Sequence, residues 1–306
     1  ASDASCKVSL ALALASNCPS SMWQELLVDA IAAPAMVFIN AGANKGMSAN
    51  SFLQRFHIGW NLTNGEWHSF QKAHMLSRHR NRAANVSCGV CRQCNDPPPH
   101  VVYGRSRAKV IAIELMLSNY HLLQTTFRHF RVPGDVVHAA VGDEDGQGAV
   151  EPTGVHQGTE NIGISASDSS RLVTLLTLDN LTASRGISEV SWLAIDTEGH
   201  DKHVLRGAKR LLSSRSIKVV EFEYHGMGSW STSSVSSEVA WLGGFGYTCF
   251  WQSNTGALSP FLPICDYDFH AWSNVLCVHE QQSLRLLGTL VPITLRMSPN
   301  AEGIPP

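Results

Sequence analysis

Long apolar runs are missing from this sequence of 306 residues, and the longest, Val8 to Ala15, is far shorter than a membrane-spanning helix needs. A surplus of positive charge is missing as well. The 23 lysine and arginine residues stand against 25 aspartate and glutamate residues, a formal net charge of -2 that argues against a general nucleic-acid binder. No internal repeat is visible. The 44% hydrophobic and 16% charged content indicates a folded chain that can bury a full core.

The start of the chain and its cysteines bear on its compartment. The sequence begins with Ala1 rather than methionine, so we expect a fragment or a processed form that lacks any upstream targeting segment or anchor. There are eight cysteines: Cys6, Cys18, Cys88, Cys91, Cys94, Cys249, Cys265 and Cys277. An even number is compatible with disulfides in an oxidising compartment. Acceptor sites for N-glycosylation occur at Asn61, Asn85 and Asn180. We favour the secretory pathway (Golgi lumen or secretion) and predict a glycoprotein, with a cytoplasmic location left open.

One stretch organises the rest of the chain: Val37 to Gly46, with the sequence VFINAGANKG. It is typical of a buried strand that runs into a glycine turn and then into a helix from Met47 to Phe56. Gly42 and Gly46 remove side chains where the backbone turns tightly and where a ligand can lie close. The N–H groups at the start of the helix then point at whatever occupies the turn. A strand-to-helix turn without a ligand stays the alternative for this stretch taken alone.

Strands and helices alternate along much of the remaining chain. Helices are predicted over 21–31, 119–130, 199–213 and 234–242, and strands over 109–113, 135–141, 172–178, 192–195 and 218–224. This alternation predicts an α/β fold with a doubly wound, mostly parallel sheet. Two late strands, 247–251 and 274–278, are expected to form an antiparallel edge. We expect an N-terminal arm and helix over 1–35, a main domain over 36–285 and a C-terminal tail over 286–306.

The stretch 57–108 interrupts this pattern. It is rich in arginine, histidine, cysteine and proline and has little periodicity, so it is predicted to be a long insertion, a lid with one short helix. Its basic residues form either a solvated face or a surface that attracts an anionic substrate such as an acidic glycan.

The insertion holds three clustered cysteines: Cys88, Cys91 and Cys94. With His100, or with one of His68, His74 and His79, they would make a four-ligand zinc site that staples the insertion. A zinc knuckle usually brings two well-spaced pairs of ligands, and these cysteines could equally form disulfides with distant ones. We favour the disulfides.

Ligands of doubly wound sheets bind beyond the carboxyl ends of the strands, so the polar residues there are the candidates for a site. They are Asn40, Gly42, Glu114, Asp143, Asp196, Glu198, Glu223 and His225. Glu221 and Glu223 face one side of their strand. Glu221 lies deeper, where we expect it to pair with a buried cation, and Glu223 lies nearer the mouth.

The glycine turn lacks the G-x-G-x-x-G spacing of dinucleotide-binding folds and fits better the D-x-G-x-G-x-G turn of S-adenosylmethionine-dependent methyltransferases. At this point the chain resembles the FkbM-like methyltransferases, whose first motif, v-f-D-v-G-A-N-x-G, corresponds to VFINAGANKG. Other motifs of that family follow in order: Glu114 in IAIEL, Ala140 to Asp143, Thr177 to Asp179, LAIDTEGHDKHVLRGA from Leu193 to Ala208, and VVEFEYH. The resemblance covers Met36 to Val278 apart from the insertion.

The resemblance implies a Rossmann-like class I methyltransferase domain and methyl transfer from S-adenosylmethionine, most often to a hydroxyl of a sugar or another small molecule. The cofactor-binding residues that it implies are Asn40, Gly42, Asn44, Gly46, Glu114, Ala140, Asp143 and Asp196. Gly42 and Asn44 would hold the amino acid end. Glu114 would accept hydrogen bonds from the ribose hydroxyls. Ala140 and Asp143 would lie near the adenine.

Three positions depart from the family pattern. Asn40 replaces an aspartate, Ala194 a common lysine, and Asp201 a glutamate. Asn40 can still accept a hydrogen bond but gives no charge to the ammonium group of the cofactor. The insertion also places Glu114 68 positions after Gly46, whereas a ribose-binding acid usually follows its glycine turn by about 20.

A hydroxyl acceptor benefits from a base that removes its proton. We expect the base among Asp196, Glu198, His200 and His225. Neighbouring carboxylates raise one another's pKa, and a histidine ionises near neutral pH. The alternatives are that Glu198 stabilises a helix N-terminus and that each histidine is an ordinary packed or surface residue.

Two other functions compete with the enzyme. A non-catalytic secreted or luminal binding module on a decayed methyltransferase fold is favoured by Asn40 and the lost lysine. The intact Gly42, Glu114 and Asp196-to-Gly199 positions argue against it. Nucleic-acid methylation is disfavoured by the overall charge and by the absence of an N-P-P-Y signature. We expect a small-molecule or glycan acceptor as the partner, with its identity and the oligomeric state undetermined by the sequence.

Overall fold

The computed structural model describes residues 2–14, 18, 22–78, 91–100, 102–150, 164–165, 172–254, 256 and 258–280. Its helices are α1 (Ser2–Leu14), α2 (Met22–Ile31), α3 (Met47–Phe56), α4 (Asn64–Arg78), η1 (Gln93–Asn95), α5 (Leu117–Phe130), α6 (Leu178–Ser184), α7 (Asp201–Arg206), α8 (Lys209–Ser213), η3 (Gly228–Thr232) and α9 (Val235–Gly243). Its strands are β1 (Ala35–Ala41), β2 (Arg107–Glu114), β3 (Gly134–His138), β4 (Ala140–Val141), β5 (Gly146–Val150), β6 (Ile164–Ser165), β7 (Leu172–Leu176), β8 (Val190–Ile195), β9 (Ile217–Tyr224), β10 (Tyr247–Gln252), β11 (Leu258–Pro260) and β12 (Ser273–His279).

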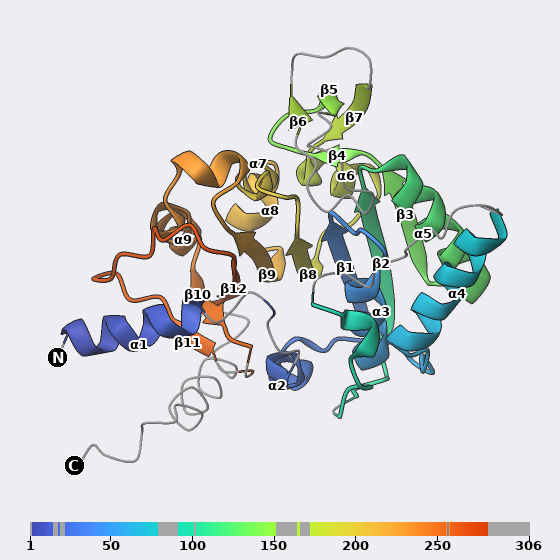
Figure 1. Ribbon diagram of the computed structural model, residues 1–306, viewed down its shortest axis with the longest axis horizontal. Coiled ribbons are helices and arrows are strands. Elements are labelled where there is room, and N and C mark those ends of the chain that lie inside the picture. Colours follow the sequence, from blue (N-terminus) through green and yellow to red (C-terminus); the bar gives the residue numbers. More distant parts are fainter. Residues whose placement is uncertain are drawn as a thin grey trace.

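Eight strands form the central sheet, in the order β11-β10-β12-β9-β8-β1-β2-β3 (Figure 1). The strands from β9 to β3 are parallel to one another, and β12 pairs antiparallel with both β9 and β10. The predicted doubly wound, mostly parallel sheet with antiparallel late strands is therefore confirmed. Because parallel strands point the same way, the carboxyl ends of β1, β2, β8 and β9 meet at one edge of the sheet.

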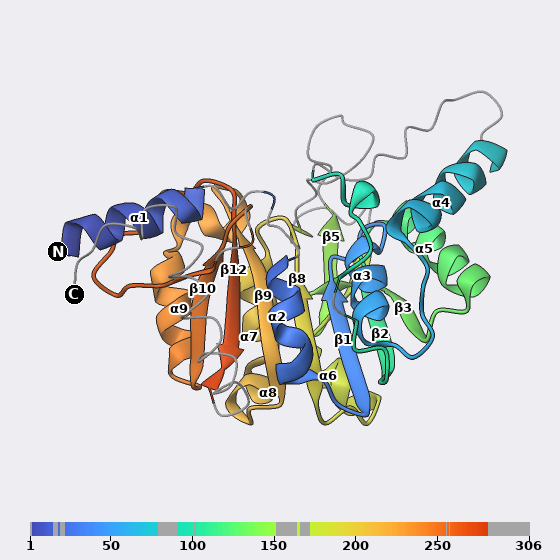
Figure 2. The same cartoon turned by 90° about the horizontal axis from the view of Figure 1, so that it is seen from below.

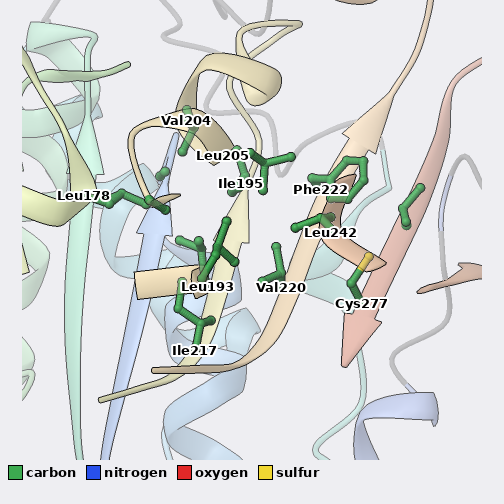
Figure 3. Packing of buried hydrophobic residues seen from close by; sticks show 14 of the residues in the cluster. Leu178, Leu193, Ile195, Val204, Leu205, Ile217, Val220, Phe222, Leu242 and Cys277 are labelled. Atoms are coloured by element: carbon green, nitrogen blue, oxygen red, sulfur yellow. The ribbon is translucent and has the colours of Figure 1, made fainter. Parts of the chain in front are cut away.

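Helices cover both faces of this sheet (Figure 2). The buried side chains of α6, α7, α8 and α9 pack against Leu193 and Val220 on one face, as Figure 3 shows from close by. Those of α2, α3 and α5 pack against Phe38 and Trp192 on the other face. All six residues of β8 are buried, because consecutive side chains enter opposite apolar layers.

The chain around the third predicted strand differs from the expectation. Instead of one strand over 135–141, β3 ends at His138 in the central sheet, and β4 joins a second sheet in the order β4-β7-β5-β6. β7 also ends earlier than predicted, at Leu176, because Thr177 caps α6 by accepting the N–H of Asn180 at 3.2 Å. Apolar residues resume at once after His138 and after Thr177, so the pattern alone could not reveal the changes.

The single helix predicted over 199–213 is divided into α7 and α8 at Gly207. A Cβ atom on Gly207 would lie 1.9 Å from the carbonyl oxygen of Gly142. The carbonyl of Gly207 accepts the N–H of Asp179 at 2.9 Å, and the Asp179 carboxylate accepts the N–H of Arg210 at 2.7 Å. Contact with the chain that follows β4 therefore interrupts the helix.

The insertion is better packed than predicted. Its helix α4 has 15 residues rather than being short. The fully buried Trp67 stacks on Phe130 of α5, with ring centroids 5.9 Å apart. At the start of α4, Asn64 donates a hydrogen bond to the carbonyl of Gln93 in η1 at 3.1 Å. The predicted short helix is therefore a long one that packs on α5, while residues 79–90 lie outside the described part of the chain.

Disulfides tie distant segments together. They are Cys6–Cys265, Cys18–Cys91 and Cys249–Cys277, and Cys94 is also disulfide-bonded. The Cys6–Cys265 bond, with a 2.7 Å hydrogen bond between the hydroxyls of Ser9 and Tyr267, holds α1 against the β10–β11 side of the sheet. Within the described ranges, no helix has the length and apolar character to span a bilayer. The expected tail over 286–306 lies outside these ranges.

Candidate active site

The glycine turn after β1 is fixed to the end of β2 by its backbone. The N–H groups of Gly42 and Ala43 donate to the carbonyl of Ile113 at 3.0 and 2.9 Å. Gly42 has a φ of 81°, and a Cβ atom there would lie only 1.7 Å from the carbonyl oxygen of Asp196. The need for glycine at this position thus comes from the close approach of the chain that follows β8, whereas the sequence suggested a ligand.

Glu114 completes this connection between the two strands. Its Oε2 accepts the N–H of Asn44 at 2.6 Å, and its Oε1 accepts the N–H of Met116 at 2.7 Å. Burial raises the pKa of Glu114 to about 7, although these two N–H groups act to lower it. The nearby charge of Asp196 raises this pKa further, and Lys45 lowers it. The carboxyl group is therefore held rigidly at the strand-end edge.

The insertion helix α4 holds the other side of the same turn. The indole N–H of Trp67 and the side-chain amide of Gln71 donate to the carbonyl of Lys45 at 2.8 and 2.9 Å. Gly46, with a φ of 80°, leaves room for neighbouring side chains, because a Cβ atom would lie 2.6 Å from Leu123 and 3.0 Å from Trp67. No local pattern indicated this role of the insertion, because the two contacts link residues 22 and 26 positions apart.

Three of the predicted cofactor-binding residues, Asn40, Ala140 and Asp143, differ in their exposure to solvent. Asn40 is buried at the end of β1, beside Ala194 of β8 in register. Ala140 is buried in β4, and Asp143 is exposed in the loop that follows. Burial alone would raise the pKa of Asp143, but its hydrogen bond to His203, at 3.1 Å between Oδ2 and Nδ1, lowers it overall.

His200 stacks on His203, with ring centroids 4.4 Å apart. Burial, and then the nearby His203, lower the pKa of His200 to about 4. The ring is therefore neutral at physiological pH, and its affinity for a proton is small. This weakens the prediction that His200 is the base.

The turn after β8 brings several carboxyl groups together. Glu198 has a φ of 53° and Gly199 a φ of 91°. α7 begins at Asp201 with His200 as its N-cap, so Glu198 does not hold the capping position that the sequence allowed. The carboxylate that folds back here is the fully buried Asp201, which accepts the N–H of Gly199 at 3.1 Å. Burial, and then the charge of Asp196, raise the pKa of Asp201 to about 7.

The end of β9 adds Glu223 and His225 to this edge. Glu223 accepts the indole N–H of Trp272 at 3.0 Å. The buried His225 accepts the N–H of Met227 on Nδ1 at 3.1 Å, and burial lowers its pKa. A neutral ring that accepts on Nδ1 carries its proton on Nε2, so His225 in this arrangement is a donor and not a base.

Glu221 lies two residues before Glu223 in β9, on the same face of the strand and farther from its carboxyl end. The sequence suggested a buried cation as its partner, but the side-chain amide of Gln252 donates to Glu221 at 3.0 Å. Burial raises the pKa of Glu221 to about 7. The neutral partner explains how this carboxyl group is accommodated without a cation.

The disulfides remove the zinc alternative. Cys91 is bonded to Cys18, and Cys94 is also disulfide-bonded, so neither offers a thiolate to a metal. In the part of the chain that the structure describes, no group of three histidine, cysteine, aspartate or glutamate residues could hold a metal ion. Cys88 and His79 lie outside that part.

Four features together define a class I methyltransferase. They are the sheet order, the glycine turn after β1, the acid at the end of β2 and the single antiparallel strand, β12, between β9 and β10. The profile described as "Methyltransferase FkbM domain" matches residues 40–267. The chain therefore belongs to the FkbM methyltransferase family, whose members use S-adenosylmethionine, and the resemblance read from the sequence is confirmed.

Other comparisons are distant. A rRNA methylase from Streptococcus thermophilus is 10% identical, with a TM-score of 0.39 over 85% of this chain and 96% of the other. The methyltransferase domain of METTL16 is 9% identical, with a TM-score of 0.36 over 84% of this chain and 64% of the other. Likenesses this low carry no argument about fold or substrate. Among curated proteins there is no significant match.

Proposed function

We propose that the protein transfers the methyl group of S-adenosylmethionine to a hydroxyl of a sugar, a glycan or another small molecule, with residues 36–285 as its methyltransferase domain. The observation that carries this proposal is the meeting of carboxyl groups at the ends of β2, β8 and β9. Asp196 lies between the other two: its backbone N–H donates to Ala41 at the end of β1, it follows β8 beside Glu223, and its charge raises the pKa of both Glu114 and Glu223. Such an edge favours a cationic cofactor and offers bases to a hydroxyl.

The residues at the ends of β1 and β2 fit the cofactor. Each oxygen of Glu114 accepts one N–H group, which leaves one acceptor position on each for a ribose hydroxyl. Asn40, Gly42, Asn44 and Gly46 would surround the amino acid end. Ala140 and Asp143 would border the adenine. When bound, the cofactor supplies a methyl group already activated on a sulfonium. The protein's part is to align the acceptor oxygen with that methyl group and to exclude water.

The acceptor would bind beyond β8 and β9, where Asp196, Glu198, His200 and His225 were predicted to supply the base. The low pKa of His200 and the donor role of His225 leave the carboxylates as the stronger candidates. The same carboxylates would repel a negative group, so we propose a neutral acceptor rather than an acidic glycan.

One observation favours the alternative of a non-catalytic binding module. The N–H groups of Gly42, Ala43 and Asn44 all donate to acceptors inside the protein, and Asn40 brings no charge. Calorimetric titration with S-adenosylmethionine and its demethylated product separates the two functions. Micromolar binding that weakens in Glu114→Gln supports the enzyme, and no binding by the folded chain at millimolar cofactor rejects it.

The location that we propose is the secretory pathway, in the Golgi lumen or beyond it. It is supported by the disulfides, because such bonds persist in oxidising compartments. A glycan would then be carried at Asn61, which is exposed between α3 and α4, rather than at Asn180, whose side-chain amide donates to Asp145. Peptide mass spectrometry after enzymatic deglycosylation in heavy-oxygen water checks this. Label at Asn180 and none at Asn61 would contradict it.

A further inference from the structure

Glu223 lies where β9 reaches the strand-end edge. In the parallel pair β8–β9, Ile195 is in register with Phe222, so Asp196, the first residue after β8, follows the strand beside Glu223, which is still within β9. On its other side, Glu223 is in register with Asn274 of the antiparallel β12. Its side chain is partly exposed, whereas Tyr224 after it is buried in the opposite layer. Glu223 is therefore at the mouth of the site, between the turn after β8 and β12.

One carboxylate oxygen of Glu223 accepts a hydrogen bond within the described part of the protein, and the other does not. The indole N–H of Trp272, which directly precedes β12, donates to Oε1 at 3.0 Å. Among the described residues no other group donates to this carboxylate, so Oε2 keeps both its acceptor positions. A carboxylate fixed through one oxygen and open at the other has the arrangement that proton transfer from a bound hydroxyl requires.

The other titratable groups at this edge are less suited to the same task. Asp196 is exposed beyond the end of β8 and Glu198 lies in the turn that follows, so neither is anchored within a strand as Glu223 is. His225 already accepts a hydrogen bond on Nδ1 and carries its proton on Nε2, and His200 binds a proton weakly. Asp201 is fully buried and holds the N–H of Gly199. Glu114 has both oxygens engaged by backbone N–H groups, on the side where the cofactor would lie. Glu221 is deeper in the sheet and bonded to Gln252.

We propose that Glu223 is the base that removes the proton of the acceptor hydroxyl, and that Trp272 is the positioning residue that orients it. This inference rests on the proposed O-methyltransferase function. In the step, the acceptor oxygen forms a bond to the methyl carbon while the bond from that carbon to sulfur breaks. The hydroxyl proton moves to Oε2 of Glu223. The products are the methyl ether, the neutral thioether of the demethylated cofactor and a protonated Glu223, which returns its proton to water.

The electrostatic surroundings agree with this assignment. Burial raises the pKa of Glu223 well above its ordinary value, and the charges of Asp196, Asp201 and Glu198 raise it further. The Trp272 N–H lowers the pKa, and the neighbour in register from β12 is the uncharged Asn274. A carboxylate with a raised pKa binds a proton more strongly, which makes it a better base near neutral pH.

The test compares Glu223→Gln with Glu221→Gln, which removes a carboxylate from the same face of β9. Methyl transfer from labelled S-adenosylmethionine is measured with neutral methyl pyranosides as acceptors, next to calorimetric cofactor binding. We expect Glu223→Gln to lower kcat by about 100-fold or more, in the range of lost general-base catalysis, with little change in cofactor affinity. Glu221→Gln should keep most of the activity.

Trp272→Phe tests the positioning role through pH. It removes a donor that stabilises the carboxylate, so the rising limb of the kcat/KM profile should move to higher pH. A readout without turnover is the indole N–H resonance of Trp272 in nitrogen-labelled protein, assigned by its loss in Trp272→Phe. It should shift with a midpoint well above ~4.3, the ordinary glutamate pKa, and should not shift in Glu223→Gln.

The outcomes separate this inference from the function on which it rests. Full activity in Glu223→Gln, or an indole resonance that does not respond to pH, rejects Glu223 as the base and leaves O-methylation standing. If the wild type binds the cofactor but methylates none of the pyranosides, the proposed function fails and the inference falls with it.

Discussion

At the ends of β1 and β2, the one acidic side chain, Glu114, receives two backbone N–H groups. At the ends of β8 and β9, Glu223 receives a single indole N–H and lies near the charges of Asp196, Asp201 and Glu198. The first half of the edge is therefore rigid, with both oxygens of its carboxyl group held by the backbone. The second half holds carboxyl groups against their mutual repulsion, at a cost in stability. This difference matches the proposed division, in which β1 and β2 bind the cofactor and β9 supplies the base.

The largest effect of a single substitution on stability should come from disturbing the contact between the two halves of the edge, where Gly42 packs against the backbone of Asp196. Gly42→Ala would force a methyl group against the carbonyl of Asp196 at a left-handed φ. We expect a loss of about 3 kcal/mol in the free energy of unfolding, because the overlap is with backbone that cannot rotate away. Denaturant titration measures it. The matched control is Gly59→Ala, which has a φ of 73° but no neighbour within 4 Å, and equal losses in both would contradict the contact.

The cost of burying carboxyl groups in both halves of this edge should appear in the pH dependence of stability. Folding raises the pKa of Glu114, Asp201 and Glu221 to about 7, so the folded protein holds these protons more tightly than the unfolded chain. Stability should therefore fall as pH rises from the ordinary carboxyl range through 7, by at most about 4 kcal/mol per group. Tm measured from pH 5 to 8 checks the sign. Glu221→Gln should flatten the curve, and a Tm that rises with pH would reject the account.

The first half can be tested through cofactor affinity. Glu114→Gln keeps the shape but loses the charged acceptor, and we expect the affinity for S-adenosylmethionine to fall by about 2 kcal/mol, the value of a hydrogen bond to a charged group. In the wild type the affinity should also fall as pH drops below 7, since a protonated Glu114 offers fewer acceptor positions. Glu189→Gln, at an ion pair with Lys218, is the calorimetric control and should leave the affinity unchanged.

The smallest effect should come from loosening the insertion. Trp67→Phe removes the indole donor to the carbonyl of Lys45 and leaves Gln71 in place, so we expect a loss of about 1 kcal/mol in stability and a modest loss of affinity. Trp60→Phe removes a similar bond, to Asn50, outside the turn. If both variants bind the cofactor equally well, α4 does not support the turn.

Much of the fold followed from local pattern. The buried strand before the glycine turn, the alternation of strands and helices, and the acid that ends β2 each depend on residues close in sequence, where period and turn chemistry are informative. The same applies to the family, because its motifs are contiguous blocks. The break at Gly207 and the passage from β3 into a second sheet were missed, because each depends on a contact with a distant carbonyl or strand.

The sequence by itself determined the class of fold, the family and the edge of the sheet where we propose that the chemistry lies, since strand direction and strand ends follow from the order of the elements. Only the tertiary structure decided which polar groups satisfy one another there. Trp272 reaches Glu223 across 49 positions, Asn44 reaches Glu114 across 70, and Cys6 reaches Cys265 across 259. Such pairings depend on how the strands and helices pack in space, and no local spacing encodes them.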